Sequence, residues 1–488
     1  MANKKQIKKV HPVGEEEFEF PVGCGTVRLK ATEDVLTPYG GLVPWAAFLT
    51  KAGIVGRLAR SCPLERTSPN ATRVGDVVNT FLLAAVCDGR RFAHINRLRE
   101  DGAAREVLGM ERICGDDTVR RFLGSLEEKA GAEWVAKAAQ TMWSALPKGG
   151  VILDWDSTVQ TKYGKQEGAE VGYNPQKRGR RSFHPLMAVA AGTRLCTYYR
   201  FRSGETVTAS EWAEAEEESA MWLGPKAKVW LHRGDRGLGT EKVMAWHEGR
   251  PEAPHYLFKL KMTRGVRRAM AAVPEDQWRG RPGGGVLQVA EAQVQLHGWS
   301  RPRRVVFGRR LLGVIPAAEA GAFWDQSRHE VEAYATDLGV AEAEAWQVVE
   351  LYRQRGDAEN VFDELKNQWG FNGFTSRRRV VSSMAARLLL LAYNLWNLFM
   401  RLMVPSRHVE AASGRRWFLL IAARLTKSGR KHLVQVSTRG RWWRLLIEGY
   451  KRLLLWISLT APQLDDQHDD SSKKTLLSCQ LPAPYCGI

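Results

Sequence analysis

The order of apolar and polar residues divides the chain into a helical first part, a strand-rich middle and a helical last part. Apolar residues recur at helical spacing over residues 45–58, 74–87, 91–99 and 118–130, after a strand-like stretch at residues 18–29. We therefore expect residues 1–145 to form a mainly helical N-terminal module. Asp117 directly precedes the last of these helical patterns and is the expected N-cap of that helix.

Strand patterns dominate residues 150–262. Apolar runs at residues 151–157, 183–191 and 195–201 predict three strands, and further strands at 227–232 and 256–260 each follow a predicted helix. This order is compatible with a ribonuclease H-like α/β core, a mixed sheet covered by helices whose first three strands are antiparallel. Residues 162–181, between the first two strands, form a loop that is rich in Gly, Lys and Arg.

Residues 263–340 interrupt this core. Strong alternation over residues 286–296, followed by an apolar run at 303–307, predicts a β-rich insertion built from hairpins. Residues 341–403 complete the core with a helix around Glu359 and a long buried helix at about 380–403. Residues 404–460 form a C-terminal region, and residues 461–488 have mixed charge without periodicity, which predicts a disordered tail.

The charge balance narrows the range of partners. The chain has 72 Lys and Arg against 53 Asp and Glu, a formal net charge of +19 and a pI near 9.7, which favours nucleic acid or an anionic membrane as partner. The longest apolar stretches, 384–403 and 445–459, are both interrupted by charged residues, so they predict core helices and no membrane span. Seven scattered cysteines and an N-terminus without an apolar signal segment fit reduced thiols in a cytoplasm, with no zinc pattern.

A nucleic-acid partner would make two arginines of the N-terminal module candidate DNA contacts. Arg120 and Arg121 follow Asp117 on a predicted helix, which would lie on DNA if it is the second helix of a helix-turn-helix. An ordinary amphipathic helix in a bundle is the alternative interpretation.

Four polar residues near position 359 share one face of a predicted helix. Their offsets of three, four and seven place them within roughly 60° of one another at about 100° per residue. A carboxylate on this face can bind a divalent cation, while a phenol and two cations beside it can bind phosphate oxygens. A solvated face with ion pairs is the alternative, and Gly356-Asp357 inside the run predicts a kink or a helix start. The four residues are Tyr352, Arg355, Glu359 and Lys366.

Two aspartates at the ends of apolar strands complete a candidate metal site. Asp156 ends the first core strand and Asp235 follows the fourth, where open sheets commonly build their sites. Together with Glu359 they can hold two magnesium ions, which activate an attacking hydroxyl and stabilise the leaving oxygen of a phosphodiester. Asp154 lies two residues before Asp156 and projects to the same strand face, so spacing alone does not choose between them.

These motifs together resemble the DDE transposases of bacterial insertion sequences, specifically the cut-and-paste group with a Tyr-Arg-Glu-Lys signature and a β-stranded insertion domain. Tyr352, Arg355, Glu359 and Lys366 match the signature at every spacing. The family's first aspartate precedes a Ser/Thr-Thr pair, which selects Asp156 over Asp154, and its second aspartate ends a strand, as Asp235 does. The resemblance covers about residues 150–403 and is expected to extend to the N-terminal module.

The resemblance implies a dimeric enzyme that binds the inverted repeats at the ends of its own element and acts with two Mg²⁺ ions, or Mn²⁺ in their place. It implies that water cuts one strand, that the new 3′-hydroxyl forms a hairpin with the opposite strand, and that the reopened end joins target DNA. By analogy, Tyr352, Arg355 and Lys366 hold phosphates. A stand-alone nuclease and a transposase-derived DNA-binding protein are the alternatives.

The insertion domain of the family supplies an aromatic side chain that stacks on a base flipped out at the hairpin. Trp299 is the candidate here, at the tip of a predicted hairpin, and a buried tryptophan that closes the hairpin is the alternative interpretation. Its rivals are Trp278 and Trp324. Three basic neighbours are expected to hold the distorted DNA backbone: Arg301, Arg303 and Arg304.

Overall fold

The computed structural model describes residues 17–23, 25–65, 68, 70–225, 227–280, 284–315, 326–428, 431–440 and 442–459. The predicted tail at 461–488 lies outside these residues. Among the residues described, no single helix has the length and apolarity to cross a membrane; α1 (Leu42–Ala52) and α2 (Ile54–Arg60), bent by 52°, meet that test only as a pair.

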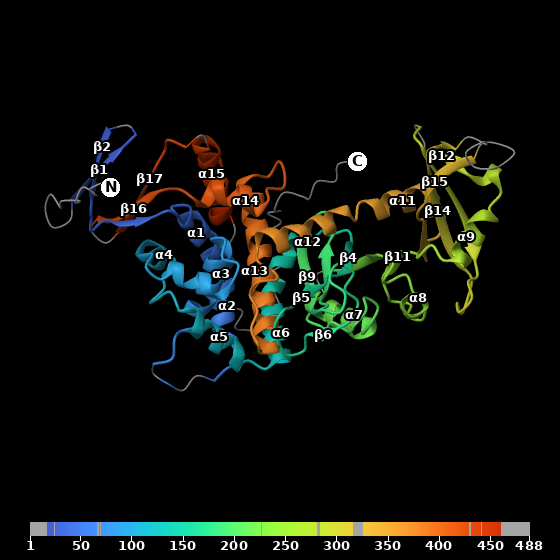
Figure 1. The fold of residues 1–488 in the computed structure, drawn as a ribbon, viewed down its shortest axis with the longest axis horizontal. Coiled ribbons are helices and arrows are strands. Elements are labelled where there is room, and N and C mark those ends of the chain that lie inside the picture. Colours follow the sequence, from blue (N-terminus) through green and yellow to red (C-terminus); the bar gives the residue numbers. More distant parts are fainter. Residues whose placement is uncertain are drawn as a thin grey trace, which may run out of the picture.

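A nine-stranded mixed sheet runs through the molecule (Figure 1). Its inner part has the order β9-β8-β4-β10-β11. β4 (Val151–Ser157), β8 (Leu186–Ala190) and β9 (Leu195–Arg200) are antiparallel, whereas β10 (Val229–Gly234) and β11 (His255–Lys259) run parallel to β4. α7 (Trp212–Leu223) and α8 (Glu241–Glu248) connect β9 to β10 and β10 to β11. This is the order of elements that the apolar pattern of residues 150–262 predicts.

The insertion continues the same sheet. β15 (Gln326–Thr336) pairs antiparallel with β11, and β14 (Arg303–Ile315), β13 (Leu287–Val294) and β12 (Arg279–Gly280) follow outward in that order. α9 (Arg264–Ala271) and the short helix η3 (Glu275–Gln277) lead into these strands. The strand content of the insertion was predicted from alternation, but its direct continuity with the core sheet was not.

The long helix α13 (Arg379–Met403) forms the centre of the helical half. It packs against α3 (Val74–Val86), α5 (Asp116–Ser125), α6 (Glu128–Ala139) and α15 (Trp443–Leu459), so the first and last parts of the chain share one core. The ring centroid of Trp396 on α13 lies 5.7 Å from that of Trp45 on α1. Such a buried helix is expected from residues 380–403, because apolar side chains occupy most of its positions.

Strands from the N-terminal and C-terminal regions also pair in a small sheet. β3 (Val35–Thr37) pairs with β16 (Ala423–Ser428), which pairs with β17 (Lys431–Val436). The strand-like stretch at 18–29 is a hairpin of β1 (Glu17–Val22) and β2 (Gly25–Lys30). Along the chain, the 3₁₀ helix η1 (Phe92–Leu98), α4 (Gly102–Val107) and the 3₁₀ helix η2 (Gln140–Ala145) complete the helical first part. The short helix α14 (Ala411–Gly414) and the π-helix η4 (Arg415–Leu419) precede β16.

Three helical predictions in the N-terminal part need correction. The helix expected at 118–130 ends at Ser125, and a second helix begins at Glu128 after extended residues Leu126 and Glu127. The helix expected at 45–58 breaks at Gly53, whose φ of 67° lies in the left-handed region that ends a helix readily only with glycine. Asp117 is not an N-cap: α5 begins at Asp116 after Gly115, and the Asp117 carboxylate accepts a hydrogen bond from Arg120 at 2.9 Å.

Candidate active site

Two of the three predicted carboxylates lie at the same edge of the sheet. β4 and β10 are parallel neighbours, and the pairing of Trp155 with Gly234 places Asp156 and Asp235 at equivalent positions one residue further on. The carboxyl ends of adjacent parallel strands therefore bring these two side chains together, as the apolar strands before them predict.

The charges of these carboxylates act on each other. Burial raises the pKa of Asp156, Arg355 opposes that rise, and the negative charge of Asp235 adds to it. The two carboxylates are thus close enough to repel, which is the situation that a divalent cation relieves. One Asp156 oxygen accepts a hydrogen bond from the Ser157 backbone N–H at 2.7 Å, and Asp235 accepts one from Gly237 N–H at 2.8 Å.

Arg355 connects the strand carboxylate to the helix carboxylate. Its Nη2 lies 2.7 Å from Asp156 Oδ2 and donates to the Trp155 carbonyl at 3.1 Å, while its Nη1 lies 3.4 Å from Glu359 Oε1. The Arg355 side chain is 4% exposed, whereas that of Glu359 is 70% exposed. One guanidinium therefore neutralises two of the three predicted metal ligands.

The donor set suits a hard divalent cation, because carboxylate oxygens are the ligands that Mg²⁺ prefers. Within the described parts of the chain, however, no group of three or more His, Cys, Asp and Glu side chains is already gathered closely enough to hold a metal ion. Arg355 lies between Asp156 and Glu359 and pairs with both carboxylates.

The four polar residues that share one predicted helix face, Tyr352, Arg355, Glu359 and Lys366, are called the stripe. They lie on two helices rather than one. Tyr352 lies near the end of α11 (Ala345–Arg353), and Glu359 and Lys366 lie on α12 (Gly356–Gln368), with Arg355 at its N-cap. Both Gln354 and Arg355 keep right-handed helical angles, so the run stays nearly continuous and the stripe stays on one side. The interruption predicted at Gly356-Asp357 is therefore a helix start, with Arg355 as its N-cap.

Electrostatics indicate that the stripe faces the aspartates. Burial raises the pKa of Tyr352 to about 12; Arg355 opposes this, and the charges of Asp235, Asp156 and Glu359 reinforce it. Burial lowers the pKa of Lys366, and Asp156 counteracts that shift. A phenol, a guanidinium and an ammonium thus surround the carboxylates, an arrangement that can bind the phosphates of a polyanion.

Asp154 has a different role from Asp156. It is fully buried and bonds the Arg233 guanidinium through both oxygens, at 2.6 and 2.8 Å, and that guanidinium also donates to the Leu351 carbonyl of α11. This ion pair fastens β4 and β10 to α11. The spacing of the sequence leaves the choice between the two aspartates open, and the structure assigns Asp154 to the framework.

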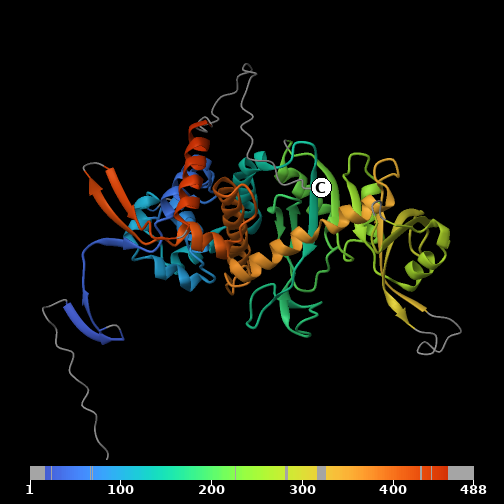
Figure 2. The same ribbon diagram turned by 90° about the horizontal axis from the view of Figure 1, so that it is seen from above.

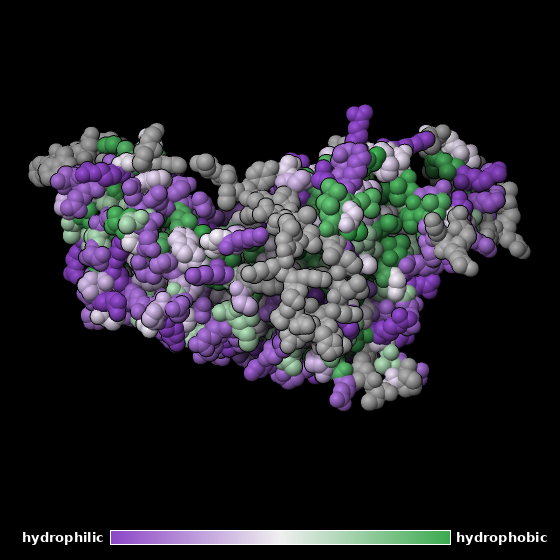
Figure 3. Space-filling model, turned by 180° about the vertical axis from the view of Figure 1, so that it is seen from behind, coloured by the Kyte–Doolittle hydropathy of each residue, from purple (hydrophilic) through white to green (hydrophobic). Residues whose placement is uncertain are grey.

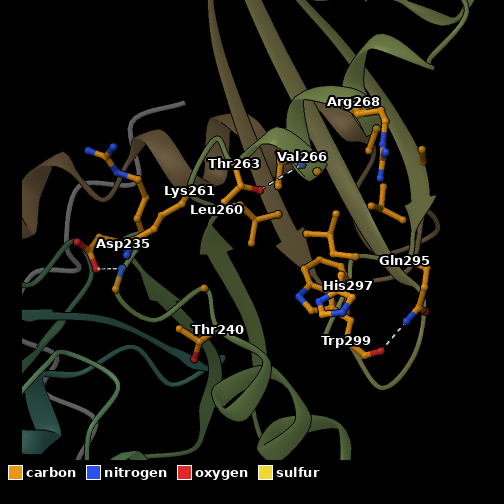
Figure 4. Close-up of a pocket in the computed structure, with 18 of the residues that line it drawn as sticks. Asp235, Thr240, Leu260, Lys261, Thr263, Val266, Arg268, Gln295, His297 and Trp299 are labelled. Carbon is orange, nitrogen blue, oxygen red and sulfur yellow. Dashed lines mark hydrogen bonds between the residues drawn. The ribbon is translucent and has the colours of Figure 1, made fainter.

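A cleft of about 1350 Å³ lies between the core and the insertion. Asp235 and Thr240 stand on one side of it, and Gln295, His297 and Trp299 on the other (Figure 4). The second aspartate and the candidate stacking tryptophan therefore open onto one space.

The comparisons with known proteins decide the family. A family model described as "Transposase DDE domain group 1" matches residues 21–455, which is most of the chain. The chain belongs to this transposase family. Transposases with a DDE domain cleave DNA and transfer its strands with the help of divalent metal ions.

Two other comparisons add little to this. No curated protein matches the chain. Among solved structures, the chain is similar to a piggyBac transposase synaptic complex with hairpin DNA, with 12% sequence identity, a TM-score of 0.38 and coverage of 89% of this chain and 85% of that one. A TM-score of that size supports no conclusion about this transposase.

The proposed stacking residue of the transposase sits in a turn after β13. Trp299 is half-buried, its backbone N–H donates to the Leu296 carbonyl at 3.0 Å, and the Arg303 guanidinium lies 5.0 Å from its ring centroid. Trp278 is 8% exposed and lies under Arg309, whereas Trp324 falls outside the described residues. Of the two tryptophans that can be compared, Trp299 is the more accessible and faces the cleft.

Two of the arginines expected to hold DNA beside Trp299 are buried in ion pairs. Arg303 bonds Glu248 at 2.6 and 2.8 Å and also Glu241. Arg304 bonds Glu291 and donates to the Leu338 carbonyl at 2.8 Å. Their guanidinium groups are bonded to carboxylates in this structure, so DNA contact would require these ion pairs to break, and their contact with DNA stays a prediction.

The third arginine differs from these two. The side chain of Arg301 is 60% exposed and lies 3.6 Å from Glu248, so it remains accessible to a phosphate.

The arginines of the N-terminal module are also engaged. Arg120 pairs with Asp116 and Asp117 on its own helix, and Arg121 donates to the Asp117 carbonyl at 3.3 Å. Acidic residues occupy the first turn of α5, where a recognition helix would face DNA bases. The structure thus favours the interpretation of α5 as an ordinary bundle helix packed against α13.

A hydrogen-bonded chain beside Asp156 was missed from the sequence. His184 Nδ1 bonds the Thr206 carbonyl at 2.6 Å, so this nitrogen carries the proton and Nε2 accepts from the Ser157 hydroxyl at 2.9 Å. Ser157 also bonds the Thr208 hydroxyl at 2.8 Å. Burial lowers the pKa of His184, which keeps the ring neutral. The Ser157-Thr158 pair after Asp156 was the available signal, but His184 lies on a different strand connection.

Proposed function

We propose that this transposase binds the terminal inverted repeats of its own element and moves it by cut-and-paste transposition through a hairpin intermediate. The observation that supports this most directly is the meeting of Asp156 and Asp235 with the Tyr352, Arg355 and Glu359 stripe at one edge of the sheet. In the bacterial cell the substrate would be nucleoid DNA. A nuclease without strand transfer is the second candidate, because it would need the same carboxylates.

We propose a ribonuclease H-like core formed by residues 150–262 and 341–403, with residues 263–340 as the insertion. The strand order β9-β8-β4-β10-β11, with three antiparallel strands followed by two parallel ones, supports this assignment. Residues 1–145 and 404–460 are then the N-terminal and C-terminal regions, which share the core built around α13.

We propose that Asp156, Asp235 and Glu359 hold two Mg²⁺ ions, with Mn²⁺ as a substitute. When bound, such ions activate the attacking oxygen and stabilise the leaving one. For this site to form, Arg355 has to release the two carboxylates that it neutralises. A DNA phosphate is the natural competitor, because a guanidinium binds phosphate and carboxylate with the same paired N–H groups.

The reaction then uses the surrounding side chains to place the DNA. In the first cut, the oxygen of water bonds to phosphorus and the bond from phosphorus to the 3′ oxygen breaks, which leaves a 3′-hydroxyl on the element. That hydroxyl attacks phosphorus in the opposite strand, and the bond from that phosphorus to the 3′ oxygen of the flanking DNA breaks. The element end closes as a hairpin, and the flanking DNA leaves with a 3′-hydroxyl. Tyr352, Arg355 and Lys366 hold phosphates on either side of the reacting one, and Trp299 stacks on a base that leaves the helix.

We propose that the DNA complex is a homodimer. The surface that supports this lies where α1 and α15 meet. Figure 3 shows apolar side chains gathered on the helical half of the molecule. Val43 of α1 is 41% exposed, and Leu454 and Leu455 of α15 are 64% and 57% exposed. Exposed apolar patches of this kind mark protein interfaces.

One reaction tests the proposal. Purified protein is incubated with Mg²⁺, a target plasmid and a labelled duplex that ends in the inverted repeat flanking the gene, and the products are resolved on a denaturing gel. We expect a nick, then a hairpin, then a product joined to the plasmid. Cutting without hairpins or joined product would support the nuclease, and the absence of any cutting would overturn both functions.

A further inference from the structure

The basic loop between the first two core strands folds into a small sheet of its own. β5 (Gln160–Thr161), β7 (Arg181–Phe183) and β6 (Glu170–Val171) pair in that order, antiparallel throughout. Figure 2 shows this segment, in teal, projecting from the body of the molecule. Residues 160–183 are called the β5–β7 platform below.

The platform is fixed to the core. Lys162 is 5% exposed and its Nζ donates to the Asn372 carbonyl at 3.1 Å. Glu167 N–H donates to the Arg377 carbonyl at 2.8 Å, and the Glu167 carboxylate accepts from Arg379 N–H at 2.9 Å. These contacts hold the platform against the segment that leads into α13, so its outer residues are presented from a defined position.

The outer residues of the platform carry unneutralised positive charge. Residues 162–181 contain six Lys and Arg against two Glu. Five of the six basic side chains are exposed, and among the residues that the structure describes only Arg181 has a carboxylate within 4 Å, that of Glu170 at 3.9 Å. The five are Lys165, Lys177, Arg178, Arg180 and Arg181.

Two exposed tyrosines accompany these charges. Tyr163 is 67% exposed, and the Lys177 ammonium and the Arg180 guanidinium lie 5.0 and 5.8 Å from its ring centroid. Tyr173 is 68% exposed and lines the same cleft as Asp235 and Trp299. Basic groups that follow a backbone and aromatic rings on which bases stack are the two components of a surface for nucleic-acid strands.

We propose that the β5–β7 platform is a second DNA contact of this protein. Lys177, Arg178 and Arg180 hold phosphates of the strand that leaves the cleavage point, and Tyr173 stacks on a base at the mouth of the cleft. The inference rests on the proposed function for its substrate, but it concerns residues outside the carboxylate site and the insertion.

The charge arm of the test measures the affinity for a fluorescein-labelled duplex at rising salt. The variant Lys177→Gln/Arg178→Gln/Arg180→Gln is compared with the wild type, and the control is Lys148→Gln, an exposed residue before β4 at the end of that strand away from Asp156. The slope of log affinity against log salt should fall by about 0.9 for each phosphate that the variant no longer neutralises, or roughly 2–3 in total. The control should keep the wild-type slope. An unchanged slope in the triple variant, with unchanged thermal unfolding, overturns the platform as a DNA contact.

The stacking arm uses an element-end duplex in which 2-aminopurine replaces one base at a time near the cleavage point. Tyr173→Ala should bind about 5- to 140-fold more weakly than the wild type and lose the quenching of one 2-aminopurine position, while Tyr173→Phe keeps the wild-type affinity and quenching. Unchanged affinity and fluorescence in Tyr173→Ala overturn the stacking role.

The two arms separate this inference from the proposed function. If the wild type cuts and joins element ends but neither arm responds, the platform inference is wrong and the transposition proposal stands. If the platform variants lower binding but the wild type neither cuts nor joins, the platform is a DNA contact of a protein that does something else.

Discussion

The substitution Asp154→Asn should lower the free energy of unfolding substantially while leaving the DNA-cleavage activity of the folded protein intact. Asp154 and Arg233 are both fully buried, and the guanidinium has bidentate bonds to this carboxylate. Asparagine keeps the size of the side chain but removes the charge, so Arg233 is left buried with an uncompensated charge. Breaking a buried pair in this way costs about 3–5 kcal/mol.

Asp156→Asn is the matched control, two residues along the same strand. Asp156 is 22% exposed, and its partner Arg355 keeps Glu359 and the Trp155 carbonyl when the charge is removed. Its loss also relieves the repulsion from Asp235. The expected cost to folding is therefore smaller, about 1 kcal/mol, but cleavage should be abolished.

Urea unfolding followed by tryptophan fluorescence gives the free energies of unfolding, and nicking of an element-end duplex gives the activities. At a urea concentration where Asp154→Asn is still folded, we expect it to retain most of the nicking rate. A folded Asp154→Asn protein without activity would mean that the wrong aspartate had been assigned to the metal site. An Asp154→Asn protein as stable as the wild type would refute the role given to the ion pair.

Three further outcomes are expected. Glu359→Gln should abolish nicking while the affinity for element ends, measured by gel shift, stays the same or rises slightly, because one negative charge facing phosphate is gone; nicking at near wild-type rate would exclude Glu359 as a ligand. Trp299→Ala should leave the first nick nearly normal and slow the hairpin step, so that nicked DNA accumulates on a denaturing gel, whereas Trp299→Phe should behave like the wild type; normal hairpins in the alanine variant would make Trp299 structural. Burial raises the pKa of Glu216 on α7 from the ordinary 4.5 to about 7; the charge of Glu217 adds to this rise and that of Arg250 opposes it. The folded protein therefore holds this proton more tightly than the unfolded chain, so the free energy of unfolding should fall as pH rises from about 4.5 to 7. Glu216→Gln should remove that fall and stabilise the protein at about pH 8 by roughly 1–3 kcal/mol, as measured by urea unfolding. The same pH dependence in both proteins would contradict this role of Glu216.

Local patterns in the sequence predict the inner sheet and the site carboxylates well. The apolar runs that become β4 and β10 are visible directly, and each is followed by its aspartate, so Asp156 and Asp235 can be placed at one edge from connectivity alone. The stripe around Glu359 survives the break between α11 and α12, because the two residues at the junction keep helical angles.

Long-range contacts explain what the sequence does not reveal. Arg303 and Arg304 look free in the sequence, but Glu248, which pairs with Arg303, lies 55 residues away. The continuity of the insertion with the core depends on pairing between Leu257 and Thr336, which no local pattern encodes. The position of Arg355 between two carboxylates likewise depends on a contact 199 residues apart in the sequence, between Arg355 at the start of α12 and Asp156 on β4.

The continuous sheet from β9 to β12 fixes the distance between the proposed cutting site and the insertion. Asp235 is set by the end of β10, and the turn that carries Trp299 is set by β13 and β14, with β11 and β15 between them. A one-residue slip in any of these pairings would shift a strand by about 3.3 Å and turn its side chains to the opposite face. An insertion or deletion inside one of these paired strands would therefore change the position of Asp235 relative to Trp299. The distance between the phosphodiester that is cut and the base that is stacked is thus fixed by the register of the strands, in pairs such as Leu257 and Thr336.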